Sequence, residues 1–121
     1  MSVNDKYIMT SHSKESFGEL IRRVRCEKQL TLTQLAAKLD MDSANLSKVE
    51  TGKREFDEKR IQMLADALNV NELELRKEYL SDFVAKKLYL SNEYEDVLEL
   101  AENKIKYFRQ NNTKQEKLNI T

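Results

Sequence analysis

Apolar residues recur at helical spacing along most of the chain, separated by short polar segments. The clearest stripe follows the spacing i, i+3, i+4 and i+7 on one helix face and consists of Leu32, Leu35, Ala36 and Leu39. Proline is absent and glycine occurs only at positions 18 and 52, so almost nothing interrupts helix between residues 16 and 111. The pattern therefore predicts an all-α fold.

A capped turn separates that short helix from a second one. Thr31 is placed to cap the first helix and Asp42 the second, with Asn45 where a capping side chain would reach back. Asp40 stands in the turn, where it tolerates a left-handed backbone better than most residues, and Gly52 supplies a left-handed stop. Helix, turn and helix in this order can lay a helix in the major groove of DNA.

The second helix, residues 43–51, offers only Leu46 and Val49 for burial and otherwise carries polar or small side chains. Met41, a lone apolar residue in the turn, is expected to be buried between the two helices. A helix with so little to bury is suited to contacting another molecule. The alternative is an ordinary pair of surface helices, capped at their ends and polar outside.

Agreement with a known family extends over residues 17–70. The matching segments are Phe17-Gly18-Glu19-Leu20-Ile21-Arg22, Leu30-Thr31, Leu35-Ala36, Asn45-Leu46-Ser47-Lys48-Val49-Glu50 and Gly52-Lys53-Arg54, with Ile61, Leu64, Ala65, Ala67, Leu68 and Val70 in a fourth helix. On these residues the chain resembles the Cro/cI-type (XRE family) helix-turn-helix domain, the fold of the phage lambda repressor. The resemblance implies a lambda-repressor-like domain of four to five helices with a C-terminal helical extension.

Two positions depart from the family pattern. Leu32 stands where the family often has a glutamine whose amide contacts a DNA phosphate, so that contact is not expected here. Asp40 stands at the turn position usually held by glycine, a replacement that costs about 1 kcal/mol of backbone strain.

The resemblance also implies which side chains face DNA. Base contacts are implied for Ser43, Ala44, Asn45 and Lys48, and phosphate contacts for Thr33, Ser47, Lys53 and Arg54. By their chemistry, Asn45 can bond adenine at N6 and N7, Lys48 can donate to guanine, and Ala44 can touch a thymine methyl. Two alternatives stay open: Asn45 acts only as a cap, and Lys53 and Arg54 only compensate the helix dipole.

Arg25 and Glu50 resemble the family's internal ion pair, which braces the first helix of the domain against the second helix of the motif. That role is structural, so Glu50 is not expected to contact DNA. The single cysteine, Cys26, lies on the same first helix and is expected to be a small, partly buried hydrophobic residue.

Beyond a fourth helix capped by Asp57, two amphipathic helices are predicted at residues 72–90 and from 91 or 92 to 111. The first carries a broad apolar stripe, and together they have more apolar surface than one small domain can cover. We therefore expect a two-fold dimer interface made of Leu80, Phe83, Val84, Leu98, Leu100, Ile105, Tyr107 and Phe108. The alternative is that these helices pack only within the monomer.

The sequence thus divides into a flexible N-terminal arm (1–14), a helix-turn-helix domain (15–70), a helical extension (71–111) and a flexible tail (112–121). The first residues are polar with no apolar run, so neither a signal peptide nor a membrane span is expected. The expected location is the cytoplasm.

Charge is balanced, with 21 basic and 21 acidic residues and a formal net charge of zero. This balance counts against promiscuous nucleic-acid binding and leaves affinity to a local basic cluster and to dimerisation. An enzyme is not expected, because His12 is the single histidine and the sequence has no metal-ligand spacing, phosphate loop or activated nucleophile. No cofactor, metal or small-molecule ligand is inferred.

Two functions of different class fit these observations. The first is a dimeric transcription regulator that binds a palindromic operator in double-stranded DNA, similar to the restriction–modification controller proteins. The second is an antitoxin-like protein that autoregulates its operon and binds a protein toxin through its C-terminal helices. A neighbouring methyltransferase and nuclease would favour the first, and a neighbouring toxin gene the second.

Overall fold

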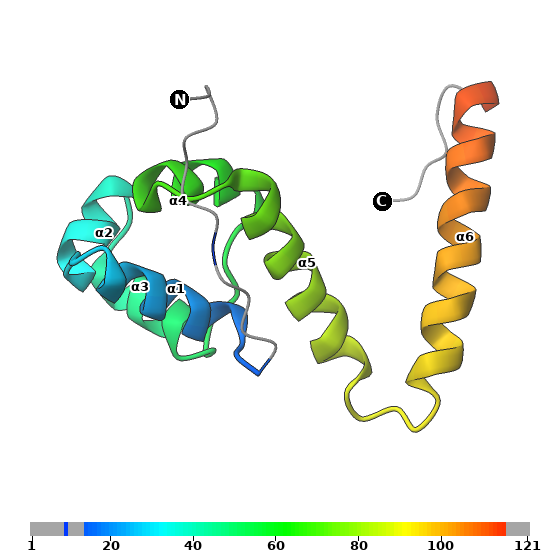
Figure 1. Cartoon of the computed structure of the whole chain (residues 1–121), viewed down its shortest axis with the longest axis horizontal. Coiled ribbons are helices and arrows are strands. Elements are labelled where there is room, and N and C mark those ends of the chain that lie inside the picture. The colour runs from blue at the N-terminus through cyan, green and yellow to red at the C-terminus, as the bar shows by residue number, and fades with distance from the viewer. Residues whose placement is uncertain (1–8, 10–13, 116–121) are drawn as a thin grey trace. The chain divides into compact units, whose positions relative to one another are not determined.

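The computed structural model describes residue 9 and residues 14–115 of the chain. Its regular elements are α1 (Phe17–Glu27), α2 (Leu32–Lys38), α3 (Ser43–Glu50), the 3-10 turn η1 (Glu58–Arg60), α4 (Ile61–Leu68), α5 (Glu72–Leu88) and α6 (Tyr94–Gln115) (Figure 1). All of these elements are helical, which confirms the predicted all-α class over the described residues. The chain divides into two compact units, Met1–Val84 and Ala85–Thr121.

One apolar core lies within the first unit, between α1 to α4 and the first part of α5. Its large, fully buried side chains are Leu20, Ile21, Val24, Leu35, Leu39, Leu46, Ile61, Leu64, Leu68, Val70 and Leu75. The ring of Phe17 lies edge-on to Tyr79, with centroids 5.2 Å apart, and 6.3 Å from the ring of Phe56. Helical spacing of apolar residues is thus what builds this core, as the sequence predicted.

Side-chain caps fix where the first three helices begin. Ser16 and Glu19 form a reciprocal capping box at the start of α1, and Thr31 and Gln34 form one at the start of α2. Asp42 caps α3 by accepting a backbone N–H of its first turn at 2.8 Å. The predicted caps at Thr31 and Asp42 are therefore confirmed.

Left-handed residues end several of the helices. Asp40 has φ 52° and Gly52 has φ 80°, as expected for the turn and the stop around α3. Asn69, with φ 56°, closes α4, and Gln29, with φ 62°, closes the turn after α1. Asn is common in this conformation, whereas Gln is not, so no sequence signal marks the turn at Gln29.

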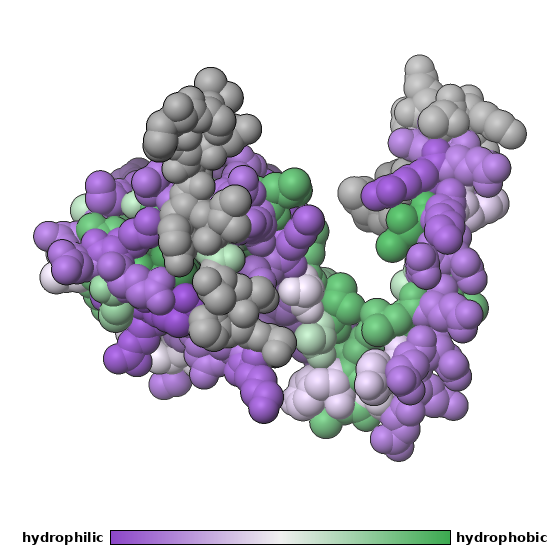
Figure 2. All heavy atoms as spheres, viewed as in Figure 1, coloured by the Kyte–Doolittle hydropathy of each residue, from purple (hydrophilic) through white to green (hydrophobic). Residues whose placement is uncertain are grey.

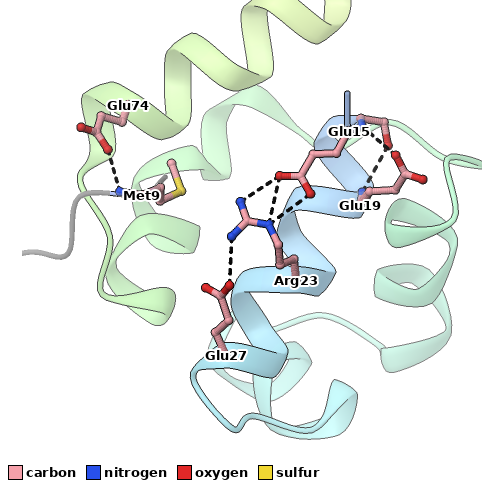
Figure 3. Close-up of polar contacts among 7 residues, drawn as sticks. Met9, Glu15, Glu19, Arg23, Glu27 and Glu74 are labelled. Atoms are coloured by element: carbon pink, nitrogen blue, oxygen red, sulfur yellow. Dashed lines mark hydrogen bonds and ion pairs between the residues drawn. The ribbon is translucent and has the colours of Figure 1, made fainter. Parts of the chain in front are cut away.

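The chain before α1 is attached to α5. Of the predicted N-terminal arm, His12 lies outside the described residues, but Met9 is only 8% exposed and belongs to the core. The backbone N–H of Met9 donates to Glu74 Oε1 at 2.9 Å (Figure 3), and that of Phe17 donates to Asp82 Oδ1 at 3.0 Å. Two backbone hydrogen bonds to acidic side chains thus attach Met9 and Phe17 to α5.

A three-residue ion network stabilises the start of α1 (Figure 3). The Arg23 guanidinium contacts the Glu15 carboxylate at 2.8 Å and that of Glu27 at 3.1 Å. These hydrogen bonds, led by the one to Glu15, raise the pKa of Arg23 above its ordinary value against an opposing effect of burial. Arg23 therefore stays charged and links the chain before α1 to the last turn of that helix.

α5 begins in the core and then leaves it. Leu75 is fully buried, and Tyr79, one turn later, packs against the core and donates its hydroxyl to Phe56 O at 2.8 Å. Leu73, two residues before Leu75, is apolar as well, yet it is 61% exposed. Two residues along a helix turn the side chain by about 200°, so Leu73 and Leu75 cannot both face the core.

The part of α5 that follows Tyr79 carries exposed apolar side chains within the first unit. Figure 2 shows hydrophobic side chains gathered there, where Leu80, Phe83 and Val84 are 43%, 42% and 41% exposed.

The second unit consists mainly of α6, which continues to Gln115, past the predicted end at residue 111. Its exposed large apolar side chains range from 39% exposed at Val97 to 59% at Tyr107, and Phe108 is half-buried. The tail predicted from residue 112 thus starts as helix, and residues 116–121 lie outside the description. Among the described helices, none has the length and apolar character that crossing a membrane requires.

α1 passes very close to the end of α3 at Gly18. A Cβ on Gly18 would collide with the carbonyl oxygen of Val49 and would lie 2.7 Å from that of Glu50. Both atoms are backbone, so α3 itself would have to move to make room. This position requires glycine for its small size rather than for its backbone freedom.

We predict that Gly18→Ala lowers the free energy of unfolding by about 1–3 kcal/mol, because it overpacks the contact between α1 and α3. Alanine is the better helix former, so helix propensity would act in the opposite direction. Urea denaturation of this variant and of Arg22→Ala, an exposed change on the same helix expected to stay within about 0.5 kcal/mol, checks the prediction. Equal stabilities of Gly18→Ala and the unmodified protein would contradict it.

Candidate nucleic-acid interface

One side of α3 is buried in the domain and the other side is open to solvent. Leu46 is fully buried, Val49 is 4% exposed and Glu50 is 7% exposed. The residues expected to face bases lie on the remaining surface, with Ala44 and Lys48 exposed and the others, Ser43 and Asn45, half-buried. Ser47, an expected phosphate contact, is also half-buried.

A buried ion pair holds the end of α3. Arg25 Nε donates to Glu50 Oε2 at 2.7 Å and Nη2 donates to Oε1 at 3.0 Å, a bidentate geometry. The third contact of Arg25, Nη1 to Leu30 O at 2.9 Å, reaches the segment between α1 and α2. The hydrogen bond to Glu50 is the main cause that raises the pKa of Arg25, against desolvation. One guanidinium therefore ties together three segments of the domain.

The segment after α3 is held equally firmly. Gly52 turns the backbone, and the N–H groups of Lys53 and Arg54 both donate to Lys48 O, at 2.8 and 3.2 Å. Lys48, Lys53 and Arg54 are all exposed. Three cations thus lie on α3 or directly after it, on a backbone whose course is fixed.

Asn45 has a different partner from the one its position suggests. Its Oδ1 accepts a hydrogen bond from Arg54 Nη1 at 3.0 Å, while Asp42 caps the helix alone through the N–H of Ala44. Arg54, an expected phosphate contact, therefore lies against an expected base contact. Thr33, the remaining expected phosphate contact, is exposed in the first turn of α2.

Two other expectations need correction. Met41 is half-buried rather than buried between α2 and α3, because it also lines a surface pocket of about 290 Å³ with Asn45, Phe56 and Arg60 among its neighbours. Cys26 is exposed rather than partly buried, since it faces away from the core on α1.

The residues expected at a dimer interface lie on two helices. Leu80, Phe83 and Val84 are exposed on α5, and Leu98, Leu100, Ile105 and Tyr107 are exposed on α6. Phe108 is half-buried, with its ring 6.0 Å from that of Tyr107.

The fold and its braced α3 define a helix-turn-helix domain, and residues 21–75 match the family model described as Helix-turn-helix. The predicted resemblance to the Cro/cI-type (XRE family) domain is thereby confirmed. Over 57 residues the chain is 42% identical to the HTH-type transcriptional repressor RghR of Bacillus subtilis (strain 168). That match covers 46% of this chain and 42% of RghR, so less than half of the relative is matched.

A solved structure is also similar to this chain. It is the crystal structure of the wild-type restriction-modification controller protein C.Esp1396I, with a TM-score of 0.46 and 22% sequence identity. The similarity covers 55% of this chain and 86% of that one.

We predict that Arg25→Ala lowers the free energy of unfolding by about 3 kcal/mol, because it leaves the buried Glu50 carboxylate without its partner. In a double-mutant cycle, Glu50→Ala should cost much less in the Arg25→Ala background than alone. Glu72→Ala, which removes the half-exposed pair with Arg76, is the matched control and should cost at most about 0.5 kcal/mol. Additive effects of the two changes at 25 and 50 in urea denaturation would show that the pair does not act as a unit.

Proposed function

We propose that the protein is a sequence-specific, double-stranded-DNA-binding transcription regulator whose α3 enters the major groove. The observation that carries the proposal is the helix-turn-helix domain at residues 21–75, in which Leu46, Val49 and Glu50 anchor α3 and leave its other face open. A helix fixed on one side and polar on the other suits contact with base edges.

The side chains on the open face have the chemistry that this role needs. Lys48 can donate to guanine, Ala44 can contact a thymine methyl, and Ser43 can bond a base or a phosphate. Thr33, Ser47, Lys53 and Arg54 are the proposed phosphate contacts, which would set the register of the protein without specifying sequence.

We further propose that two copies bind a palindromic operator through a dimer formed by α5 and α6. The support is the exposed apolar surface described above, which an amphipathic helix normally buries against a partner. A two-fold dimer would place the two α3 helices about 34 Å apart, one turn of DNA. The balanced net charge supports the same proposal, because two local basic clusters would have to supply the affinity.

The exposed stripe on α6 also fits a second candidate function. In an antitoxin-like protein, the same helix-turn-helix domain would autoregulate an operon while Leu98, Ile105 and their neighbours bind a protein toxin. A controller role in a restriction–modification system is a narrower form of the first proposal.

The test of the proposed function is selection of bound sequences from a random double-stranded DNA library with the purified, folded protein. We expect a two-fold symmetric motif with half-sites about one helical turn apart. Enrichment of no sequence would reject DNA recognition and favour the protein-partner alternative.

We predict that substitutions of base-contacting and phosphate-contacting residues have different effects on DNA binding. Asn45→Ala should cost about 1–3 kcal/mol on the selected operator and relax preference at one base-pair position. Lys53→Ala should weaken all sequences alike and reduce the salt slope of binding by about 1. Lys77→Ala removes the same charge from an exposed position on α5 and serves as the control. Identical effects of the first two variants across a set of operators would contradict the assignment.

We predict that the double substitution Leu98→Glu and Ile105→Glu produces a monomer that binds half-sites weakly, because charges replace exposed apolar side chains of the proposed interface. Sedimentation equilibrium measures the oligomeric state, and circular dichroism checks that helix content is kept. Asn103→Glu, a polar position exposed on the same helix, should leave the dimer intact. An unmodified protein that stays monomeric at every concentration would refute the dimer.

A further inference from the structure

Arg54 and Asn45 are joined before any DNA is present. Arg54 Nη1 donates to Asn45 Oδ1 at 3.0 Å. The start of the Arg54 side chain is fixed relative to α3, because its own N–H and that of Lys53 both bond to Lys48 O. The contact therefore joins two well-placed residues rather than two free surface side chains.

The chemistry of the pair determines how the amide of Asn45 is turned. A guanidinium has only N–H donors, whereas an asparagine amide has one accepting oxygen and one donating NH2 group. Arg54 can therefore pair only with the oxygen. The NH2 group of Asn45 is then the part of the amide that is left to face another molecule.

We propose that Arg54 is a positioning residue that determines specificity by acting through Asn45. Its hydrogen bond turns the Asn45 amide so that Asn45 contacts a base edge as a hydrogen-bond donor. This inference rests on the proposed function. Guanine presents two acceptors in the major groove, N7 and O6, whereas adenine presents the acceptor N7 beside the donor N6. A bidentate contact with adenine needs the amide oxygen, which adenine would have to share with Arg54. Because Arg54 already occupies one of the two lone pairs of that oxygen, the adenine contact is weakened and Asn45 prefers guanine, in contrast to the adenine contact that its residue type alone allows.

The same arrangement leaves Arg54 able to contact the DNA backbone. One of its five N–H groups bonds to Asn45, and the others can donate to a phosphate oxygen. A phosphate, Arg54, Asn45 and a base would then form one chain of hydrogen bonds. Holding Asn45 in one orientation beforehand also lowers the entropy that is lost when it binds a base.

The experiment is selection from a random double-stranded DNA library with the full chain and three variants, Asn45→Ala, Arg54→Ala and Lys53→Ala. The base pair contacted by Asn45 is the position whose preference disappears in Asn45→Ala. At that position the unmodified protein should prefer guanine, and Arg54→Ala should lower the guanine-to-adenine affinity ratio about tenfold. Lys53→Ala removes a charge from the adjacent residue and should leave this ratio unchanged.

A fourth variant with both Asn45→Ala and Arg54→Ala shows whether Arg54 acts through Asn45, because the ratio should then equal that of Asn45→Ala alone. Preference for adenine in the unmodified protein would overturn the inference. The inference would also be overturned if Arg54→Ala lost affinity but kept the guanine-to-adenine affinity ratio of the unmodified protein, as is expected of Lys53→Ala. If the unmodified protein enriches no sequence, the proposed function itself fails and this inference fails with it.

Discussion

The close contact between α1 and the end of α3 is the constraint on which the domain depends. Gly18 allows the helices to approach until its Cα lies against the carbonyl groups of Val49 and Glu50. About two helix turns further along α1, Arg25 reaches across to the Glu50 carboxylate and to Leu30 O. Steric fit and charge pairing thus act at the same place, and both set the position of α3 rather than merely adding stability.

Much of this fold has a local cause that is visible in the sequence. Apolar spacing places Leu35, Leu46 and Leu64 in the core, and Thr31 and Asp42 cap the helices at which they stand. These features depend on residues within one or two helical turns, so single-sequence patterns detect them. The Arg25–Glu50 pair spans 25 positions and was expected from a family resemblance, not from spacing.

Structural features that depend on contacts between distant segments are not visible in the local sequence pattern. Met9 looks like part of a polar arm, yet its side chain packs in the core, and Glu74, 65 positions away, accepts its backbone N–H. Asn45 stands at a position where a helix cap is expected, but its hydrogen-bond partner is Arg54, nine residues further along the chain. The turn after α3 brings Arg54 back toward Asn45, and this is visible only in the folded structure. Cys26 and Met41 are less buried than expected because packing with neighbouring segments decides which face of α1, and which side of the turn between α2 and α3, the core covers.

α5 is one continuous helix of 17 residues, with Leu75 and Tyr79 anchored in the core and Leu80, Phe83 and Val84 exposed in the next turns. A rigid helix transmits orientation, because each residue adds about 100° of rotation and 1.5 Å of rise. Any partner that binds the exposed turns would therefore be held at a fixed angle to the helix-turn-helix domain. The number of residues in α5 therefore sets the direction in which its exposed apolar side chains point. Inserting one residue after Tyr79 would rotate these side chains by about a quarter of a revolution relative to the core without changing which residues they are.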